Sequence, residues 1–357
     1  MQARLVPRTE ISQTMVWLTP VLAILLTLFF GAFLFIYLGF DPVRGLQTYF
    51  IEPVSTAYGV GELALKATPL ALIALGLSLG FRANVWNIGA EGQFTVGAIC
   101  GGGVALLFYD TNSWWLLPLM ALAGIIGGMA YAFIPALLKT RFNANEILTS
   151  LMLTYLATLF LSYLVHGPWR DPDGLNFPES RMFSDSAALP ILMEGTRFNV
   201  GAIVAIGVIA AVWLLLARGF IGYQIKVVGQ APKAAAFAGF DPRRVVWLTF
   251  GIGGGLAGLS GLFEVSGAIG QLHPSISSGY GFTAIIVAFL GRLHPIGIIA
   301  ASLLIALSYL GGETAQISMG LPLAITGVFQ GMLLFFLLGC DVLIRYRLRF
   351  SLAAMVR

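Results

Sequence analysis

The chain is poor in charge, cysteine and histidine, and each shortage excludes a class of protein. Charged residues make up 10% of its 357 residues, whereas an average soluble protein has about 25%, so a soluble globular fold is excluded. The two cysteines, Cys100 and Cys340, both lie in apolar runs, which is typical of small core residues and not of a disulfide or a metal pair. The three histidines lack the spacing of a ligand pair, so we expect no metal site. A net charge of +4 gives no indication of nucleic-acid binding.

Apolar sequence, in contrast, is abundant. Hydrophobic residues make up 58% of the chain and the mean hydropathy is +0.89. A spanning helix needs about 20 apolar residues, and the apolar runs supply about ten such helices. We therefore predict an all-α polytopic membrane protein, some of whose helices are short or broken, with residues 1–357 forming a single transmembrane domain. The predicted spans are approximately 16–38, 62–81, 93–109, 115–138, 146–166, 198–217, 245–266, 277–291, 295–311 and 322–343.

The placement of the basic residues predicts the orientation in the membrane. When the spans are threaded alternately through the bilayer, most of the 20 Lys and Arg residues fall on one side. Lys and Arg concentrate in cytoplasmic loops. We therefore predict that both termini are cytoplasmic and that the number of spans is even. Within the second span, Lys66 lies four residues after Glu62, a spacing that favours a local ion pair.

Two segments outside the membrane stand out. The external loop 167–197 is rich in Pro, Asp and Ser; it either docks an external partner or is a solvated connector. The cytoplasmic loop 219–244 contains Pro232, which can open a short helix that runs to Phe237, and Gly239 and Pro242 can close this helix. Its small alanines and one Phe fit either a groove on another protein or the membrane surface.

The stretch Asn84–Thr95, NVWNIGAEGQFT, places amides, a carboxylate and glycines between two apolar runs. Polar groups at membrane depth are costly and usually face a protein interior or a water-filled path. Irregular backbone is tolerated there only where protein buries it or where it lines a cavity. The motif therefore predicts a broken helix beside a solute path.

Four stretches together are typical of one family. They are Phe81–Gly97 (FRANVWNIGAEGQFTVG), Asn145–Tyr155 (NEILTSLMLTY), Gly229–Asp241 (GQAPKAAAFAGFD) and Gly261–Gly297 (GLFEVSGAIGQLHPSISSGYGFTAIIVAFLGRLHPIG). In these stretches the chain resembles the permease subunits of bacterial ABC importers, in the branch related to ribose and branched-chain amino-acid permeases. Within that branch it is most similar to the nucleoside permeases that work with basic-membrane-protein-type binding lipoproteins. The NIGAEGQ motif and the external loop are similar to those of the longer of the family's two paired permease types.

The resemblance implies a permease domain in the bacterial cell (inner) membrane that forms the path for nucleosides. The implied partners are a second related permease in a heterodimer, a cytoplasmic ABC ATPase, an external nucleoside-binding lipoprotein or periplasmic protein, and membrane lipid. No GxxxxGK[ST] motif occurs, so we expect ATP to be used by the partner ATPase. We expect this chain to be no enzyme, with no catalytic residues and no cofactor. The alternatives are a ribose-type sugar ABC permease and an ion-coupled secondary transporter.

The same resemblance implies that the cytoplasmic loop couples the permease to the ATPase. It matches the family's short helix that sits in an ATPase groove. The residues that we expect to take part are Gly229, Pro232, Ala234, Ala235, Ala236, Phe237 and Gly239.

Two groups of residues are candidates for the substrate path. The first is Asn87, Glu91, Gln93 and Thr95, whose amides can match the donors and acceptors of a nucleoside. The alternative is that they satisfy the broken backbone, with Glu91 paired to Arg82.

The second group is Tyr280, Phe282 and Thr283 in GYGFT, whose rings either stack on a base or pack between helices. Glu264, near the outer end of the seventh span, is either a gate or a helix-pairing hydrogen-bond partner. The GFT triplet resembles Gln93-Phe94-Thr95, which suggests an inverted repeat or a chance match.

Overall fold

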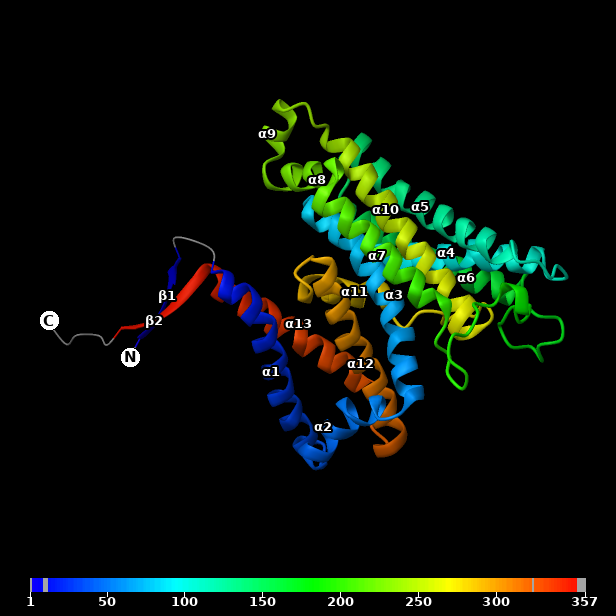
Figure 1. Ribbon diagram of the computed structural model, residues 1–357, viewed down its shortest axis with the longest axis horizontal. Coiled ribbons are helices and arrows are strands. Elements are labelled where there is room, and N and C mark those ends of the chain that lie inside the picture. The colour runs from blue at the N-terminus through cyan, green and yellow to red at the C-terminus, as the bar shows by residue number, and fades with distance from the viewer. Residues whose placement is uncertain (1, 9–11, 323, 352–357) are drawn as a thin grey trace. The chain divides into compact units, whose positions relative to one another are not determined.

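The computed structural model describes residues 2–8, 12–322 and 324–351, which form helices and one two-stranded sheet (Figure 1). In chain order the elements are β1 (Gln2–Pro7), α1 (Gln13–Tyr37), α2 (Pro42–Phe50), η1 (Glu52–Val54), α3 (Ala57–Arg82), α4 (Ala90–Leu107), α5 (Leu116–Phe142), α6 (Glu146–His166), η2 (Asp185–Ala187), α7 (Val200–Arg218), α8 (Phe220–Gln230), α9 (Pro232–Phe237), α10 (Pro242–Phe263), the π-helix η3 (Glu264–Ile269), α11 (Tyr280–Leu290), α12 (Pro295–Met319), α13 (Ala324–Arg345) and β2 (Tyr346–Ser351).

The prediction of an all-α polytopic membrane protein is confirmed. Eight of the described helices are long and apolar enough to cross a membrane, namely α1, α3, α5, α6, α7, α10 together with η3, α12 and α13. Two further predicted spans correspond to shorter helices, α4 with 18 residues and α11 with 11 residues. The helices α2 and α8 were not predicted as separate elements. The chain forms two compact units, residues 1–56 with 307–357 and residues 57–306.

The first unit contains α1, α2, the second half of α12, α13 and the strand pair. Its core gathers aromatic rings, with Tyr49 stacked on Phe329 at 4.5 Å between ring centroids and Phe35 beside Phe329 at 5.9 Å. The Tyr49 hydroxyl lies 2.9 Å from the Ser308 hydroxyl oxygen. β1 and β2 pair antiparallel along their whole length. The two ends of the described chain therefore lie together, which is compatible with the predicted even number of spans.

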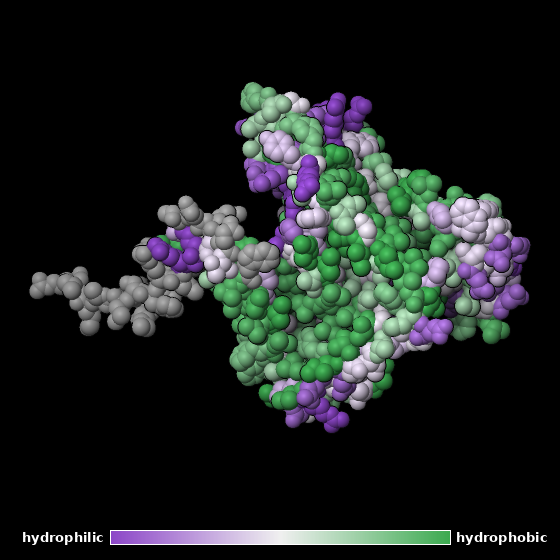
Figure 2. All heavy atoms as spheres, in the orientation of Figure 1, coloured by the Kyte–Doolittle hydropathy of each residue, from purple (hydrophilic) through white to green (hydrophobic). Residues whose placement is uncertain are grey.

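The second unit is built around α3 and α10, and glycines let its helices approach closely. The apolar stretches of α3 and α10 are 83% and 78% buried, whereas those of α6 and α7 are 28% and 22% buried. A Cβ on Gly97 would lie 2.1 Å from the Cα of Gly258, so the backbones of α4 and α10 touch there. On the face shown in Figure 2, apolar side chains lie between a polar end around α8 and α9 and a polar end at the loop after α6. This arrangement fits a unit that crosses a bilayer.

Candidate functional site

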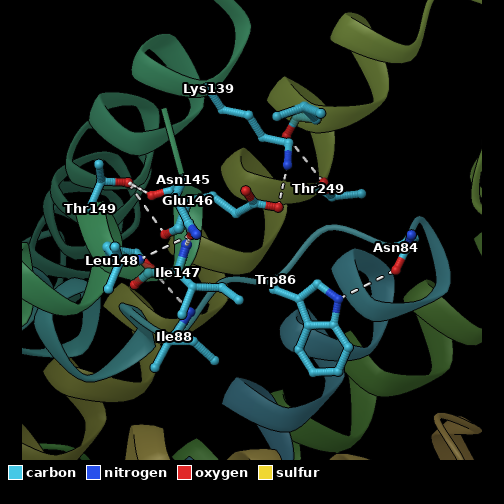
Figure 3. Close-up of polar contacts among 12 residues, drawn as sticks. Asn84, Trp86, Ile88, Lys139, Asn145, Glu146, Ile147, Leu148, Thr149 and Thr249 are labelled. Carbon is cyan, nitrogen blue, oxygen red and sulfur yellow. Dashed lines mark hydrogen bonds and ion pairs between the residues drawn. The ribbon is translucent and has the colours of Figure 1, made fainter. Parts of the chain in front are cut away.

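The NVWNIGAEGQFT motif forms a break between two helices of the second unit. α3 ends at Arg82, and α4 begins at Ala90. Asn84 turns the chain in the left-handed region (φ 56°), which Asn tolerates better than most residues. Its side-chain oxygen accepts a hydrogen bond from the Trp86 indole at 3.4 Å (Figure 3). The sequence therefore predicted the break in the right place.

Asn87 and Gln93 pair with each other across this break. The Asn87 amide donates to Gln93 Oε1 at 2.9 Å, and the Gln93 amide donates to Asn87 Oδ1 at 3.1 Å. Asn87 Oδ1 also accepts from the backbone N–H of Gly89 at 3.0 Å. Both side chains are buried, with exposed fractions of 5% and 1%. In this structure the two amides satisfy one another and the broken backbone, as buried polar groups must; their contact with a solute stays a prediction.

Glu91 joins the start of α4 to the start of α11. Its Oε2 atom accepts a hydrogen bond from the backbone N–H of Gly281 at 2.5 Å, and its carboxylate also bonds to Ser277 and to the backbone of Gly279. The first N–H groups of a helix have no partner within the helix and carry a partial positive charge, so a carboxylate is favoured there. Arg82, which we considered as the partner of Glu91, instead donates to the Leu293 carbonyl at 2.7 Å and 3.1 Å.

This contact lies deep within the second unit. Arg82 holds the turn after α11 against the end of α3. α11 has 11 residues, and a helix of that length is about 16 Å long. The contact between Glu91 and Gly281 thus lies about one length of α11 away from the turn that Arg82 holds. The start of α11 is buried there, so its N–H groups need a partner within the protein, and Glu91 supplies one.

The other predicted path residues differ in how deeply they are buried and in which groups they contact. Tyr280 is buried with its ring edge-on to Phe94 (6.1 Å between centroids), and it forms a hydrogen bond with Glu264 in η3. The Thr95 hydroxyl donates to the backbone carbonyl of Glu91 at 2.9 Å. Thr283 is buried as well, whereas Phe282 is 39% exposed. Among the predicted path residues, Phe282 offers the most accessible aromatic face.

A pair of charges that sequence reasoning missed lies at the other end of α3. The Arg197 guanidinium holds the Glu62 carboxylate with two hydrogen bonds, Nε to Oε1 at 2.8 Å and Nη2 to Oε2 at 2.5 Å. This bond raises the pKa of Arg197, which therefore stays charged. We had expected Lys66 to be the local partner of Glu62. The pair with Arg197 joins residues that lie 135 positions apart in the sequence, and the local contact with Lys66 stays a prediction.

The Asn145–Tyr155 stretch, at the start of α6, is hydrogen-bonded to the irregular residues between α3 and α4. Asn145 caps α6 by accepting from the N–H of Ile147 at 2.9 Å, and Glu146 forms an ion pair with Lys139 near the end of α5 (Figure 3). One turn later the Ser150 hydroxyl accepts from the N–H of Ile88 at 3.2 Å. α6 thereby holds the irregular residues between α3 and α4.

The predicted cytoplasmic helix is present as α9, which begins at Pro232 and ends at Phe237. Ala235 is fully buried, whereas Phe237 is 94% exposed. The ring of Phe240, just after α9, packs edge-on against Phe220 and Tyr223 of α8.

Three residues of the predicted docking set thus lie elsewhere than on the exposed face of α9, and one of them, Gly239, follows the end of the helix. Gly229 belongs to α8, where a Cβ would lie 1.9 Å from the Arg82 carbonyl oxygen, so α8 packs on the end of α3. Ala235 faces inward. The exposed positions of α9 are Pro232, Lys233, Ala234, Ala236 and Phe237.

Known proteins resemble the chain along most of its length. Residues 59–338 match the family model described as branched-chain amino acid transport system / permease component. The chain is 35% identical to a glucose ABC transporter permease protein of Haloferax volcanii, over 97% of this chain and 93% of that protein. It is 28% identical to a nucleoside ABC transporter permease protein of Lactococcus lactis, over 90% of each chain. It is also 28% identical to a guanosine ABC transporter permease protein of Bacillus subtilis, over 89% of this chain and 92% of that protein.

From each of these organisms a second protein with a permease name also matches. These second matches cover less of this chain, 64% for Haloferax, 71% for Lactococcus and 66% for Bacillus.

Proposed function

The chain belongs to the branched-chain amino acid transport system / permease component family, and from that premise we propose that it carries nucleosides as one permease of a heterodimeric ABC importer. It is an ABC transporter permease, a membrane-spanning subunit that is not itself an enzyme. The proposed partners are a second permease, a cytoplasmic ATPase that uses ATP, and an external nucleoside-binding protein. The proposed location is the bacterial inner membrane with both termini in the cytoplasm.

The observation that carries the nucleoside assignment is the combination of groups around the start of α11. Phe282 presents a partly exposed ring one residue after the Glu91–Gly281 contact, and the Asn87–Gln93 amide pair lies in the adjoining break. Stacking of a base on an aromatic face contributes about 1–3 kcal/mol. Amide side chains can both donate and accept hydrogen bonds. The nucleoside and guanosine relatives support the same substrate class.

The second candidate substrate is a simple sugar. It is favoured by the Haloferax relative, which is named for glucose and has the higher identity of 35%. A sugar offers hydroxyl groups but no extended aromatic face. A path that carries sugars would therefore depend on the amide pair and gain little from Phe282.

The pairing with a second permease is supported by the relatives. In three organisms two distinct permease-named proteins match this chain, one over 89–97% of its length and the other over 64–71%. A pair of unequal but related subunits accounts for this pattern, with the present chain corresponding to the better-covered member. The proposed contact with the ATPase is the exposed face of α9, centred on Phe237.

The test is uptake by cells that contain the complete set of subunits. We expect labelled adenosine or guanosine to enter in an ATP-dependent manner, and ribose and glucose to compete weakly. Phe282→Ala should lower nucleoside uptake severalfold at equal protein abundance. Uptake of ribose or glucose without nucleosides would transfer the assignment to the sugar alternative, and uptake without the ATPase subunit would favour a secondary transporter.

A further inference from the structure

The external loop lies along the connection between α10 and α11 and is bonded to it by backbone hydrogen bonds. Leu189 N–H donates to the Ser266 carbonyl at 2.9 Å, and Phe183 N–H donates to the Gly270 carbonyl at 2.7 Å. Ser180 N–H donates to the Leu272 carbonyl at 2.9 Å. The loop is therefore more than a solvated connector, because its backbone supplies partners for the η3 segment.

Side chains add to this attachment at the same place. The Leu272 N–H donates to the Ser180 hydroxyl oxygen at 2.9 Å. The Gln271 amide donates to a Glu179 carboxylate oxygen at 2.5 Å. Several bonds across so short a segment attach the loop to residues 264–272, because hydrogen bonds that act together resist separation more than any one alone.

Arg197 ties this attached segment to the membrane-spanning helices. Its Nη1 atom donates to the Ala268 carbonyl at 3.3 Å, while Nε and Nη2 hold Glu62 of α3. The planar guanidinium can serve both partners at once, which a lysine ammonium cannot do with the same geometry. Its side chain is 48% exposed while that of Glu62 is 5% exposed, so Arg197 joins the external surface to a buried carboxylate.

The attached segment leads directly to the candidate path. η3 is a π-helical stretch, a form that is rare and concentrated at functional sites. It carries Glu264, the hydrogen-bond partner of Tyr280, and it continues through Gly270 (φ +83°) to the start of α11. A displacement of η3 would therefore reach Tyr280 and the Glu91–Gly281 contact.

We propose that Arg197 is a positioning residue for transport, which fixes the external loop to η3 and α3. A solute-binding protein docked on the loop then moves the α10–α11 connection and the Glu91–Gly281 contact together. The proposal rests on the proposed function in one respect, that an external binding protein docks on this loop. Beyond that function, the proposal names Arg197 as the residue that transmits the effect of docking, and the Glu91–Gly281 contact as the place that the effect reaches.

The first test measures how the binding protein stimulates ATP hydrolysis by the reconstituted complex. Arg197→Gln should lower the maximal stimulation severalfold and leave the half-saturating concentration of binding protein unchanged, because the docking face is intact. Arg170→Gln is the matched control, since it removes the same charge from the same loop outside the attachment to η3. It should leave the maximal stimulation unchanged. An Arg197→Gln complex with normal maximal stimulation would overturn the proposal.

A second test does not depend on how well the Arg197 variant folds. Cysteines at Glu179→Cys and Gln271→Cys, in a background with Cys100 and Cys340 replaced by alanine, can be bridged by a short, reducible bifunctional thiol reagent. If the loop and η3 move as one body, the bridged complex retains its stimulation. Loss of stimulation on bridging, restored by reduction, would show that the two must separate and would overturn the proposal. Failure of nucleoside uptake in the unmodified complex would instead affect only the substrate assignment.

Discussion

At the scale of single residues, the candidate site depends on a close approach of two backbones. The Cα of Gly281 lies against Glu91, where a Cβ would be 2.3 Å from the Glu91 nitrogen and 2.6 Å from its Cα. This approach brings the Gly281 N–H within 2.5 Å of the Glu91 carboxylate. Any side chain at position 281 would push α11 away from α4 and remove that bond.

We therefore predict that Gly281→Ala destabilises the complex and abolishes most uptake. Overpacking of a tight contact costs about 1–3 kcal/mol, and here backbone atoms, which cannot rotate away, form the obstacle. Thermal unfolding of the purified complex and an uptake assay measure the two effects. Gly207→Ala in α7 is the control, because a Cβ there meets nothing within 4 Å and alanine favours a helix. Equal stability and uptake in the two variants would contradict this description of the contact.

Some of these residues could be predicted from the sequence and others could not. The break at Asn84–Thr95 could be predicted because polar groups in an apolar run require an internal partner, and Asn87 and Gln93 supply one for each other. The partner of Glu62 could not, because Arg197 lies 135 positions away and only the fold brings the two together. Ion pairs between distant segments leave no periodic signal in a single sequence.

At the scale of elements, turn chemistry accounts for what was predicted and what was missed. The sequence Gly-Phe-Asp-Pro occurs at the start of both α2 and α10, and its Pro is the first helical residue. Gly39 and Gly239 adopt φ of +82° and +83°, and Asp41 and Asp241 cap the helix that follows. This repeated signal, a capping Asp before Pro, could have revealed α2. A search for long apolar runs did not, because α2 has only 9 residues. The π-helix η3 has no sequence signature of its own.

The exposed face of α9 provides the prediction at this scale. Phe237→Ala removes a ring that is 94% exposed, so folding should be unaffected. If α9 docks in an ATPase groove, the variant should reach the membrane at normal abundance but lose most of its coupling. The measurement is the ratio of nucleoside transported to ATP hydrolysed.

Ala235→Glu provides a contrast to this variant. Ala235 is fully buried, and an unpaired carboxylate is costly in a buried position. This substitution should therefore reduce the abundance of the protein, not only its coupling. Unchanged coupling in Phe237→Ala would indicate that α9 lies on the membrane surface without an ATPase contact.

At the scale of the whole molecule, the paired termini and the placement of charge both bear on how the chain is oriented in the membrane. β1 and β2 hold the two ends of the described chain together, which supports the predicted even number of crossings. Eight helices of the described residues are long enough to cross, and α4 and α11 are two shorter elements. The number of crossings is even whether or not these two are counted. Which side the termini occupy then depends on the Lys and Arg residues alone.

We predict from those residues that the loop after α6 is external and that α9 is cytoplasmic. Asp173 and Lys233 are both exposed, so a cysteine at either position is accessible wherever it lies. In a background without Cys100 and Cys340, a membrane-impermeant thiol reagent should label Asp173→Cys in intact cells. It should label Lys233→Cys only after the membrane is opened. Arg347→Cys in β2 should behave like Lys233→Cys, because β2 follows a span that ends on the same predicted side. The opposite labelling pattern would place α9 outside the cell, where no cytoplasmic ATPase could reach Phe237, and the coupling proposal would fail together with the topology.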